Sequence, residues 1–187
     1  MSKIGRKPID ISKVQVIESG SKLVLKNAGD SVSIEIPKTL QIRIVDKQLF
    51  LEPNFDLNNA DHTVRREVSR TWGLYRALLN NYVQGLAKQF ESELHINGLG
   101  FKAVPVGRSI TFTLGYSHKI DFQLPQGVSV DVDKTGQRLT IKSTNKEIVG
   151  KVCSDIKALR PTEPYKGTGI KLAKEVILRK AGKTKSS

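Results

Sequence analysis

The chain is poor in cysteine and has no long apolar run. Its single cysteine, Cys153, excludes an internal disulfide framework and a cysteine-based zinc site, as is usual in a reducing compartment. No stretch approaches the roughly 20 consecutive apolar residues that a membrane span needs. Residues 1–7 lack the apolar core of a secretory signal. We therefore expect a protein with no membrane segment that works where it is made.

Acidic residues are also scarce. The sequence has 18 Asp and Glu against 31 Lys and Arg, and the net charge of +13 attracts polyanions. Residues 157–187 carry nine basic and two acidic side chains, or +7, whereas residues 1–10 carry +2. This concentration predicts a polyanion-binding segment, and a solvated basic tail without function is the alternative.

Two stretches repeat one pattern at a constant offset of 88 residues. The repeated positions are Pro37, Leu40, Ile42 and Ile44 in the first stretch and Pro125, Val128, Val130 and Val132 in the second. Alternation of apolar and polar residues predicts strands with one buried face, and proline is tolerated at a strand end. A chance match is the alternative, because alternation is common and the proline alone is distinctive.

Each copy leads into a predicted helix. The first has apolar residues at three- and four-residue spacing: Val64, Val68, Trp72, Tyr75, Leu78, Leu79, Tyr82 and Leu86. Four arginines lie largely off this stripe: Arg65, Arg66, Arg70 and Arg76. In the second, Thr144 and Glu147 fit a capping box, and Arg160-Pro161 ends the helix. Its apolar stripe is Ile148, Val152, Ile156 and Leu159.

Strands followed by one helix, twice over, predict an α+β fold. We expect two similar domains related by internal duplication, each a mainly antiparallel sheet packed against one helix. The predicted boundaries are residues 1–84 and 85–175, followed by a basic tail at 176–187, because apolar alternation restarts at Leu94 and Ile96. Domains of about ninety residues are near the small end for independent folding.

Residues 98–103, GLGFKA, have the spacing of a dinucleotide-binding fingerprint, with Asp121 about twenty residues further on. Such a site needs a helix at this turn, whereas the following residues continue a strand pattern. We therefore predict a tight turn or bulge at Gly98 and Gly100. A nucleotide-dependent enzyme is the alternative.

Other candidate catalytic or metal-binding residues are interpreted as structural. Residues 182–184 resemble the end of a phosphate-binding loop, but Ile177 stands where that motif needs a glycine. The histidines lie in different elements without metal-ligand spacing: His62, His95 and His118. We expect no catalytic residue, metal, cofactor or small-molecule substrate, and thus no enzyme.

The most specific stretch is residues 160–171, RPTEPYKGTGIK. Its prolines fix the backbone, and its glycines remove side chains where a phosphate backbone approaches. Tyr165 can stack on a base, while lysines and arginines neutralise phosphates. The predicted RNA-binding residues are Arg160, Tyr165, Lys166, Gly167, Gly169, Lys171, Lys174, Arg179, Lys180, Lys183 and Lys185. The alternative is a loop that covers the end of the second sheet, with Tyr165 as its plug.

This segment resembles the C-terminal signature of the bacterial-type large-subunit ribosomal protein six family, a proline-rich turn followed by Glu-Pro-Tyr-Lys-Gly-x-Gly. The resemblance spans nearly the whole chain and includes residues 2–9, 72–81, 98–103, 175–176 and 179–183. The chain departs from the family where lysine, proline and glutamate are common, at Thr168, Thr162 and Ala181 respectively, and in the turn at 27–30.

The resemblance implies a structural constituent of the large ribosomal subunit. Its second domain would bind large-subunit ribosomal RNA near the factor-binding region at the stalk base. Its other partners would be neighbouring large-subunit ribosomal proteins, with no membrane partner. The resemblance implies a cytoplasmic ribosome, or one in an organelle's stroma or matrix. A free RNA or DNA chaperone is the alternative.

Overall fold

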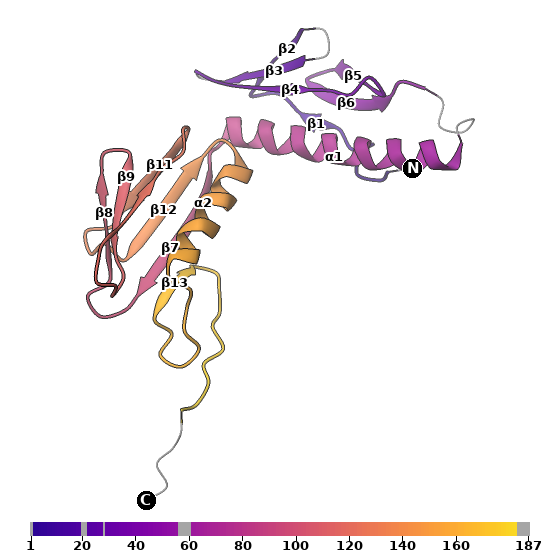
Figure 1. Ribbon diagram of the computed structural model, residues 1–187. Coiled ribbons are helices and arrows are strands. Elements are labelled where there is room, and N and C mark those ends of the chain that lie inside the picture. Colours follow the sequence, from indigo (N-terminus) through magenta and orange to yellow (C-terminus); the bar gives the residue numbers. More distant parts are fainter. Residues whose placement is uncertain (1, 20–21, 28, 56–60, 183–187) are drawn as a thin grey trace, which may run out of the picture. The chain divides into compact units, whose positions relative to one another are not determined.

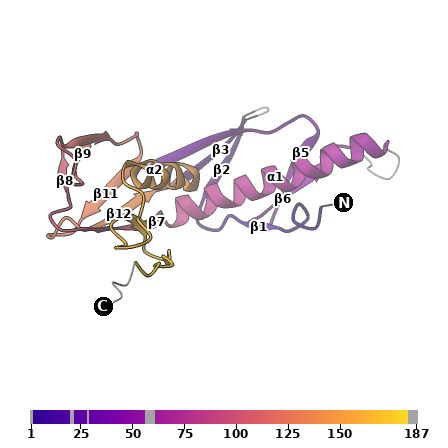
Figure 2. The ribbon, with the colours of Figure 1, turned by 60° about the horizontal axis from the view of Figure 1, so that its bottom comes forward.

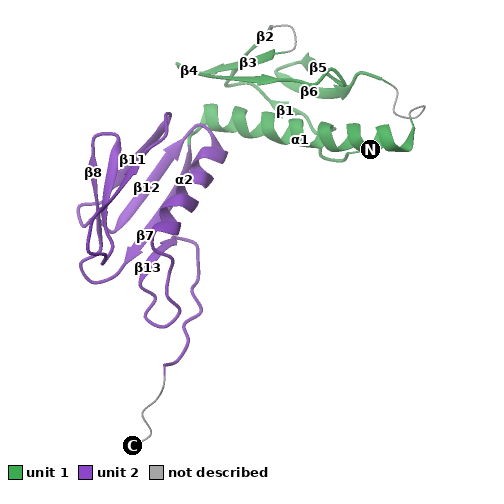
Figure 3. Cartoon of the chain, in the orientation of Figure 1, with its two compact units in different colours: residues 1–89 green, residues 90–187 purple. Residues whose placement is uncertain are grey.

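The computed structural model describes residues 2–19, 22–27, 29–55 and 61–182. The chain divides into two compact units, residues 1–89 and residues 90–187, which Figure 3 colours separately. The boundary predicted from the sequence lies after residue 84. In the structure the helix that ends unit 1 continues through this point to Ala87.

Unit 1 packs one face of its antiparallel sheets against a long helix (Figure 1). Its sheets have the strand orders β1-β6-β5 and β2-β3-β4. The elements are β1 (Ile9–Asp10), β2 (Gln15–Ser19), β3 (Lys22–Asn27), β4 (Asp30–Glu35), β5 (Leu40–Val45), β6 (Gln48–Pro53) and α1 (His62–Ala87). Alternating strand residues such as Leu23 and Leu25 share one core with the helix residues Trp72 and Leu79.

Polar contacts hold the N-terminus and the middle of α1. The Asp61 carboxylate caps its N-terminus by accepting from the His62 N–H and the Thr63 hydroxyl, at 2.7 Å each. Further along, the Arg76 guanidinium donates to the carbonyls of Lys7 and Pro8, at 3.2 and 3.0 Å, and so holds the N-terminal segment. The predicted apolar stripe is correct for most positions from Val68 onward, but Val64 is exposed and Leu78 lies outside the core. The prediction also missed the buried Val83.

Unit 2 packs a shorter helix against its larger sheet, as Figure 2 shows for α2, β7 and β12. Its sheets have the strand orders β10-β9-β8 and β11-β12-β7-β13. The elements are β7 (Phe90–Asn97), β8 (Lys102–Val106), β9 (Ser109–Thr113), β10 (Ile120–Gln123), β11 (Val128–Val132), β12 (Arg138–Ser143), α2 (Lys146–Leu159) and β13 (Gly169–Leu172).

The start of α2 corrects one prediction. Its N-cap is Asn145, whose side-chain oxygen accepts from the Glu147 N–H at 2.9 Å, instead of Thr144. Asparagine is at least as good an N-cap as threonine, so the helix begins one residue later. The buried stripe is Val149, Val152, Cys153 and Ile156, with Ile148 and Leu159 partly buried beside it. Burial raises the pKa of the Cys153 thiol.

The predicted α+β fold with two similar units is confirmed by the order of elements and by strand register. The sheets β1-β6-β5 and β2-β3-β4 of unit 1 correspond to β7-β12-β11 and β8-β9-β10 of unit 2. Pro37 lies two residues after β4 and three before β5, and Pro125 has the same place between β10 and β11. Ile42 pairs with Leu51 as Val130 pairs with Ile141.

The glycines at 98 and 100 lie in the connection between two strands. Gly100 has a φ of 73°, in the region that favours glycine, and the Phe101 N–H donates to the Gly98 carbonyl at 3.3 Å. The chain then enters β8 at Lys102, where a dinucleotide fingerprint would need a helix. The prediction of a turn at this position is confirmed.

Candidate nucleic-acid interface

Residues 161–168 form a loop that backbone hydrogen bonds close on itself. The Gly167 N–H donates to the Glu163 carbonyl and the Glu163 N–H donates to the Thr168 carbonyl, both at 2.9 Å. The Thr168 hydroxyl adds a bond to the Glu163 carboxylate at 3.3 Å. Thr168, where the resemblance expects lysine, therefore tightens the base of the loop.

The two ends of this loop cross at Gly169. The Ile170 N–H donates to the Arg160 carbonyl at 2.8 Å, and Pro161 bridges Ile170 in parallel. A Cβ on Gly169 would lie 2.6 Å from the Pro161 carbonyl oxygen, and its φ is +130°. Glycine is therefore required here so that the two backbones can approach each other.

Arg160 is positioned by an aromatic ring from another part of unit 2. Its guanidinium carbon lies 4.9 Å from the centroid of the Tyr116 ring, a cation–π contact. The Tyr116 hydroxyl donates to the Leu159 carbonyl at 3.0 Å and so occupies an acceptor at the end of α2. The half-buried Arg160 is thus held at the edge of the loop, and the sequence analysis did not identify Tyr116.

The tip of the loop points into solvent. The side chain of Tyr165 is 54% exposed and lies outside the core cluster of unit 2, and Lys166 is exposed beside it. Gly167 is buried with a φ of +70°, and a Cβ there would lie 3.1 Å from the guanidinium of Arg179. Glycine therefore lets an arginine from the following segment approach the loop backbone.

The segment after β13 returns to the loop, as Figure 1 shows. The Lys180 N–H donates to the Pro164 carbonyl at 3.0 Å. This bond brings Arg179 and Lys180 beside Tyr165 and Lys166, although the two pairs are far apart in sequence. The result is one surface with an exposed ring and several cations.

Lys157 and Glu175 fix the start of the returning segment. The Lys157 ammonium donates to the Glu175 carboxylate at 2.6 Å, and the Leu172 N–H donates to the same carboxylate at 3.2 Å. The hydrogen bond from Lys157, and then that from Leu172, lowers the pKa of Glu175. Both side chains are about one-third exposed. The pair joins α2 to the chain after β13, and the sequence patterns did not predict that Glu175 pairs with Lys157.

The remaining predicted residues are distributed differently. Ile170 is fully buried in the core, and Lys171, next to it on β13, pairs across to His95 of β7. Lys174 lines a separate hollow with Glu91 and Glu93. Lys183 and Lys185 lie outside the described residues.

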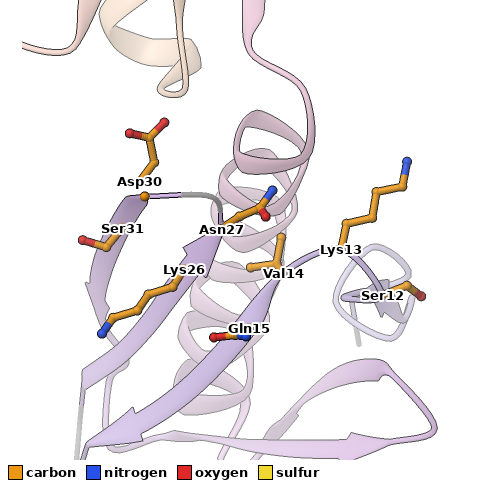
Figure 4. Close-up of a pocket in the computed structure, with 9 residues that line it drawn as sticks. Ser12, Lys13, Val14, Gln15, Lys26, Asn27, Asp30 and Ser31 are labelled. Carbon is orange, nitrogen blue, oxygen red and sulfur yellow. The ribbon is translucent and has the colours of Figure 1, made fainter.

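One hollow in unit 1 lacks the convergent charges of a ligand site. A hollow of about 650 Å³ in unit 1 is lined by Lys13, Lys26, Asp30 and mainly polar neighbours. Figure 4 shows that the two lysines point in different directions, so their charges do not converge. Within the described ranges, no group of three or more metal-ligating side chains comes together, and no helix is long and apolar enough to cross a membrane.

Comparison with known proteins places this duplicated α+β chain in the class of ribosomal proteins. The family model described as "Ribosomal protein L6" matches residues 97–172, which include the loop, β13 and most of unit 2. The chain belongs to the uL6 family of the large ribosomal subunit, as its relatives show.

These relatives match along almost their whole length. The large ribosomal subunit protein uL6 of Campylobacter fetus subsp. fetus is 39% identical to the chain over 185 residues. The uL6 proteins of Campylobacter curvus and Helicobacter hepaticus are each 40% identical over 185 residues. In all three comparisons the match covers 98% of this chain and 98% of the relative.

Proposed function

We propose that this protein binds large-subunit ribosomal RNA mainly through residues 160–182 and the basic residues that follow, near the factor-binding region at the stalk base. It is a protein of the large ribosomal subunit and not an enzyme. Its partners are that RNA and neighbouring large-subunit proteins, in the ribosomes of the cytoplasm. Its two domains correspond to the units at residues 1–89 and 90–187, because the predicted boundary at 84/85 lies inside α1, and residues 176–187 serve as its basic tail.

One observation carries the proposal: the bond from Lys180 N–H to the Pro164 carbonyl gathers cations around an exposed tyrosine. RNA-binding proteins combine cations for the phosphates with aromatic rings on which unpaired bases stack. A plug role for Tyr165 would require a buried ring, whereas more than half of its surface is open.

The tyrosine and the lysine should affect binding differently. Tyr165→Ala should weaken binding of large-subunit ribosomal RNA by roughly 1–3 kcal/mol with little change in salt dependence, because stacking is lost. Tyr165→Phe, which keeps the ring, should bind like the wild type. If Tyr165→Ala lowers the melting temperature and weakens binding only as far as unfolding explains, the ring is structural.

Lys166→Ala should change the salt dependence of RNA binding. Loss of one phosphate contact flattens the slope of log affinity against log salt by about 0.7 to 0.9. The matched control is Lys134→Ala, which removes an exposed lysine from the turn between β11 and β12 of the same unit. Equal slopes for the two variants would argue against a phosphate contact at Lys166.

Sedimentation separates the proposal from the chaperone alternative. A constituent of the large subunit should remain with large subunits after a high-salt wash, whereas a free RNA or DNA chaperone should remain in the soluble fraction. A protein that leaves the subunit in the first wash would contradict the proposal.

A further inference from the structure

The N-terminal part of α1 carries basic side chains on one face. At about 100° per residue, the residues of this face fall within an arc of roughly 140°: His62, Arg65, Arg66, Ser69 and Arg70. Val68 and Trp72 leave the helix outside this arc and are buried in the core of unit 1. Glu67, the acidic residue of this stretch, also lies outside the arc.

These five side chains line a shallow groove of about 320 Å³, here called the arginine groove. Among the described residues, its lining contains guanidinium, imidazole and hydroxyl groups and neither a carboxylate nor an apolar side chain. The groove is therefore a concentrated positive site within unit 1.

The fold of unit 1 does not use Arg66 and Arg70. Both are exposed, and neither forms an ion pair with a carboxylate in the described part of the chain. Arg76 differs, because its guanidinium is bonded to the carbonyls of Lys7 and Pro8. Like charges four residues apart on a helix repel each other, and a bound polyanion would relieve this repulsion.

We propose that the arginine groove binds the sugar-phosphate backbone of RNA, as a second contact that is separate from the candidate interface of unit 2. Guanidinium groups match phosphate oxygens in a bidentate fork. Side chains four residues apart, such as Arg66 and Arg70, have Cβ atoms about 5–6 Å apart, comparable to the step between successive phosphates.

An acidic protein is a poorer fit to this groove. Protein interfaces concentrate their binding energy in aromatic or apolar anchors that fill pockets. The lining of the arginine groove provides no such anchor among its described residues. The contact is to phosphates and should be independent of base sequence.

The test uses the full chain and a mixed-sequence RNA duplex of about 16 base pairs, the length that a double-stranded RNA-binding domain spans. Replacing both exposed arginines, in the groove variant Arg66→Gln with Arg70→Gln, should flatten the slope of log affinity against log salt by about 1.4 to 1.8, because two phosphate contacts are lost. Replacing both by lysine should retain the slope.

The matched control is Lys38→Gln with Arg43→Gln, which removes the same charge from exposed positions elsewhere in unit 1. It should leave the slope unchanged. Equal slopes for the groove variant and the control would overturn the inference. So would a groove variant that loses affinity for poly-glutamate but not for the duplex, because the partner would then be a protein.

Lys166→Ala separates this inference from the proposed function. This comparison uses large-subunit ribosomal RNA, and if both surfaces bind it, combining Lys166→Ala with the groove variant should add the two slope changes. If only Lys166→Ala changes the slope, the arginine groove does not bind RNA and the proposed interface of unit 2 is retained. If only the groove variant changes the slope, the inference about the groove is retained and the proposed function is contradicted.

Discussion

Gly169→Ala should destabilise unit 2 and displace the loop. A non-glycine residue at a φ of +130° costs about 1–3 kcal/mol in backbone strain. The new Cβ would also lie 2.6 to 2.9 Å from backbone atoms of residues 160–162, which cannot rotate away. The crossing must therefore open, and the hydrogen bond from Ile170 to Arg160 contributes about 0.5–1.5 kcal/mol.

The total expected loss of unfolding free energy is about 1.5–4.5 kcal/mol, measured by urea unfolding of the full chain. Affinity for large-subunit ribosomal RNA should fall as well, under conditions where the variant is still folded. Gly182→Ala is the matched control, because nothing lies within 4 Å of its Cβ position. Its unfolding free energy should stay within about 0.5 kcal/mol of the wild-type value. If Gly169→Ala behaves like this control, the close crossing of the two backbones is wrong.

Variants at three further positions test how unit 2 supports the interface. Gly150→Ala should stabilise unit 2 by about 0.5–1 kcal/mol in urea unfolding, because it removes backbone freedom from a helix position with open space around the Cβ. The folded pKa of Glu175 is lowered from its ordinary 4.5, so its contribution to stability is present above that value and is lost as the pH falls through the folded pKa. The stability difference between wild type and Glu175→Gln should accordingly shrink between pH 7 and pH values below 4.5; a constant difference would contradict the ion pair. Tyr116→Phe should lower the unfolding free energy in the same assay by up to about 1 kcal/mol, because the bond to the Leu159 carbonyl is lost. It should keep its RNA affinity, since the ring remains against Arg160. Tyr116→Ala should lower both the unfolding free energy and the RNA affinity.

The repeated fold could be predicted because its signals are local. Burial on one face of a strand produces alternation within a few residues, and a proline at a strand end marks the register. The offset changes from 88 at β5 and β11 to 90 at β6 and β12, because the turn at 46–47 is shorter than the connection at 133–137. Periodicity did not predict that Val64 would be exposed, because the pattern does not show which helix turns the sheet covers.

The candidate interface was predicted less completely, since it depends on contacts between distant residues. The Tyr116 hydroxyl binds a carbonyl 43 residues away, and Glu175 pairs with a lysine 18 residues before it. No local pattern indicates either contact. Strand β13 was expected to be part of a loop, because four residues beginning with glycine are too few for alternation to be recognised.

The candidate interface is an addition to the duplicated unit. Strand β7 corresponds to β1, and each pairs on one side with its equivalent partner, β12 or β6. On its other side β7 pairs with β13 over four residues, whereas in the described part of unit 1 that edge of β1 pairs with no strand. Strand β1 has two residues and β7 has eight, so β7 alone is long enough to pair fully with β13. The repeat thus supplies a sheet and a helix twice, and residues 160–182 are anchored through β13 on the copy with the longer edge strand.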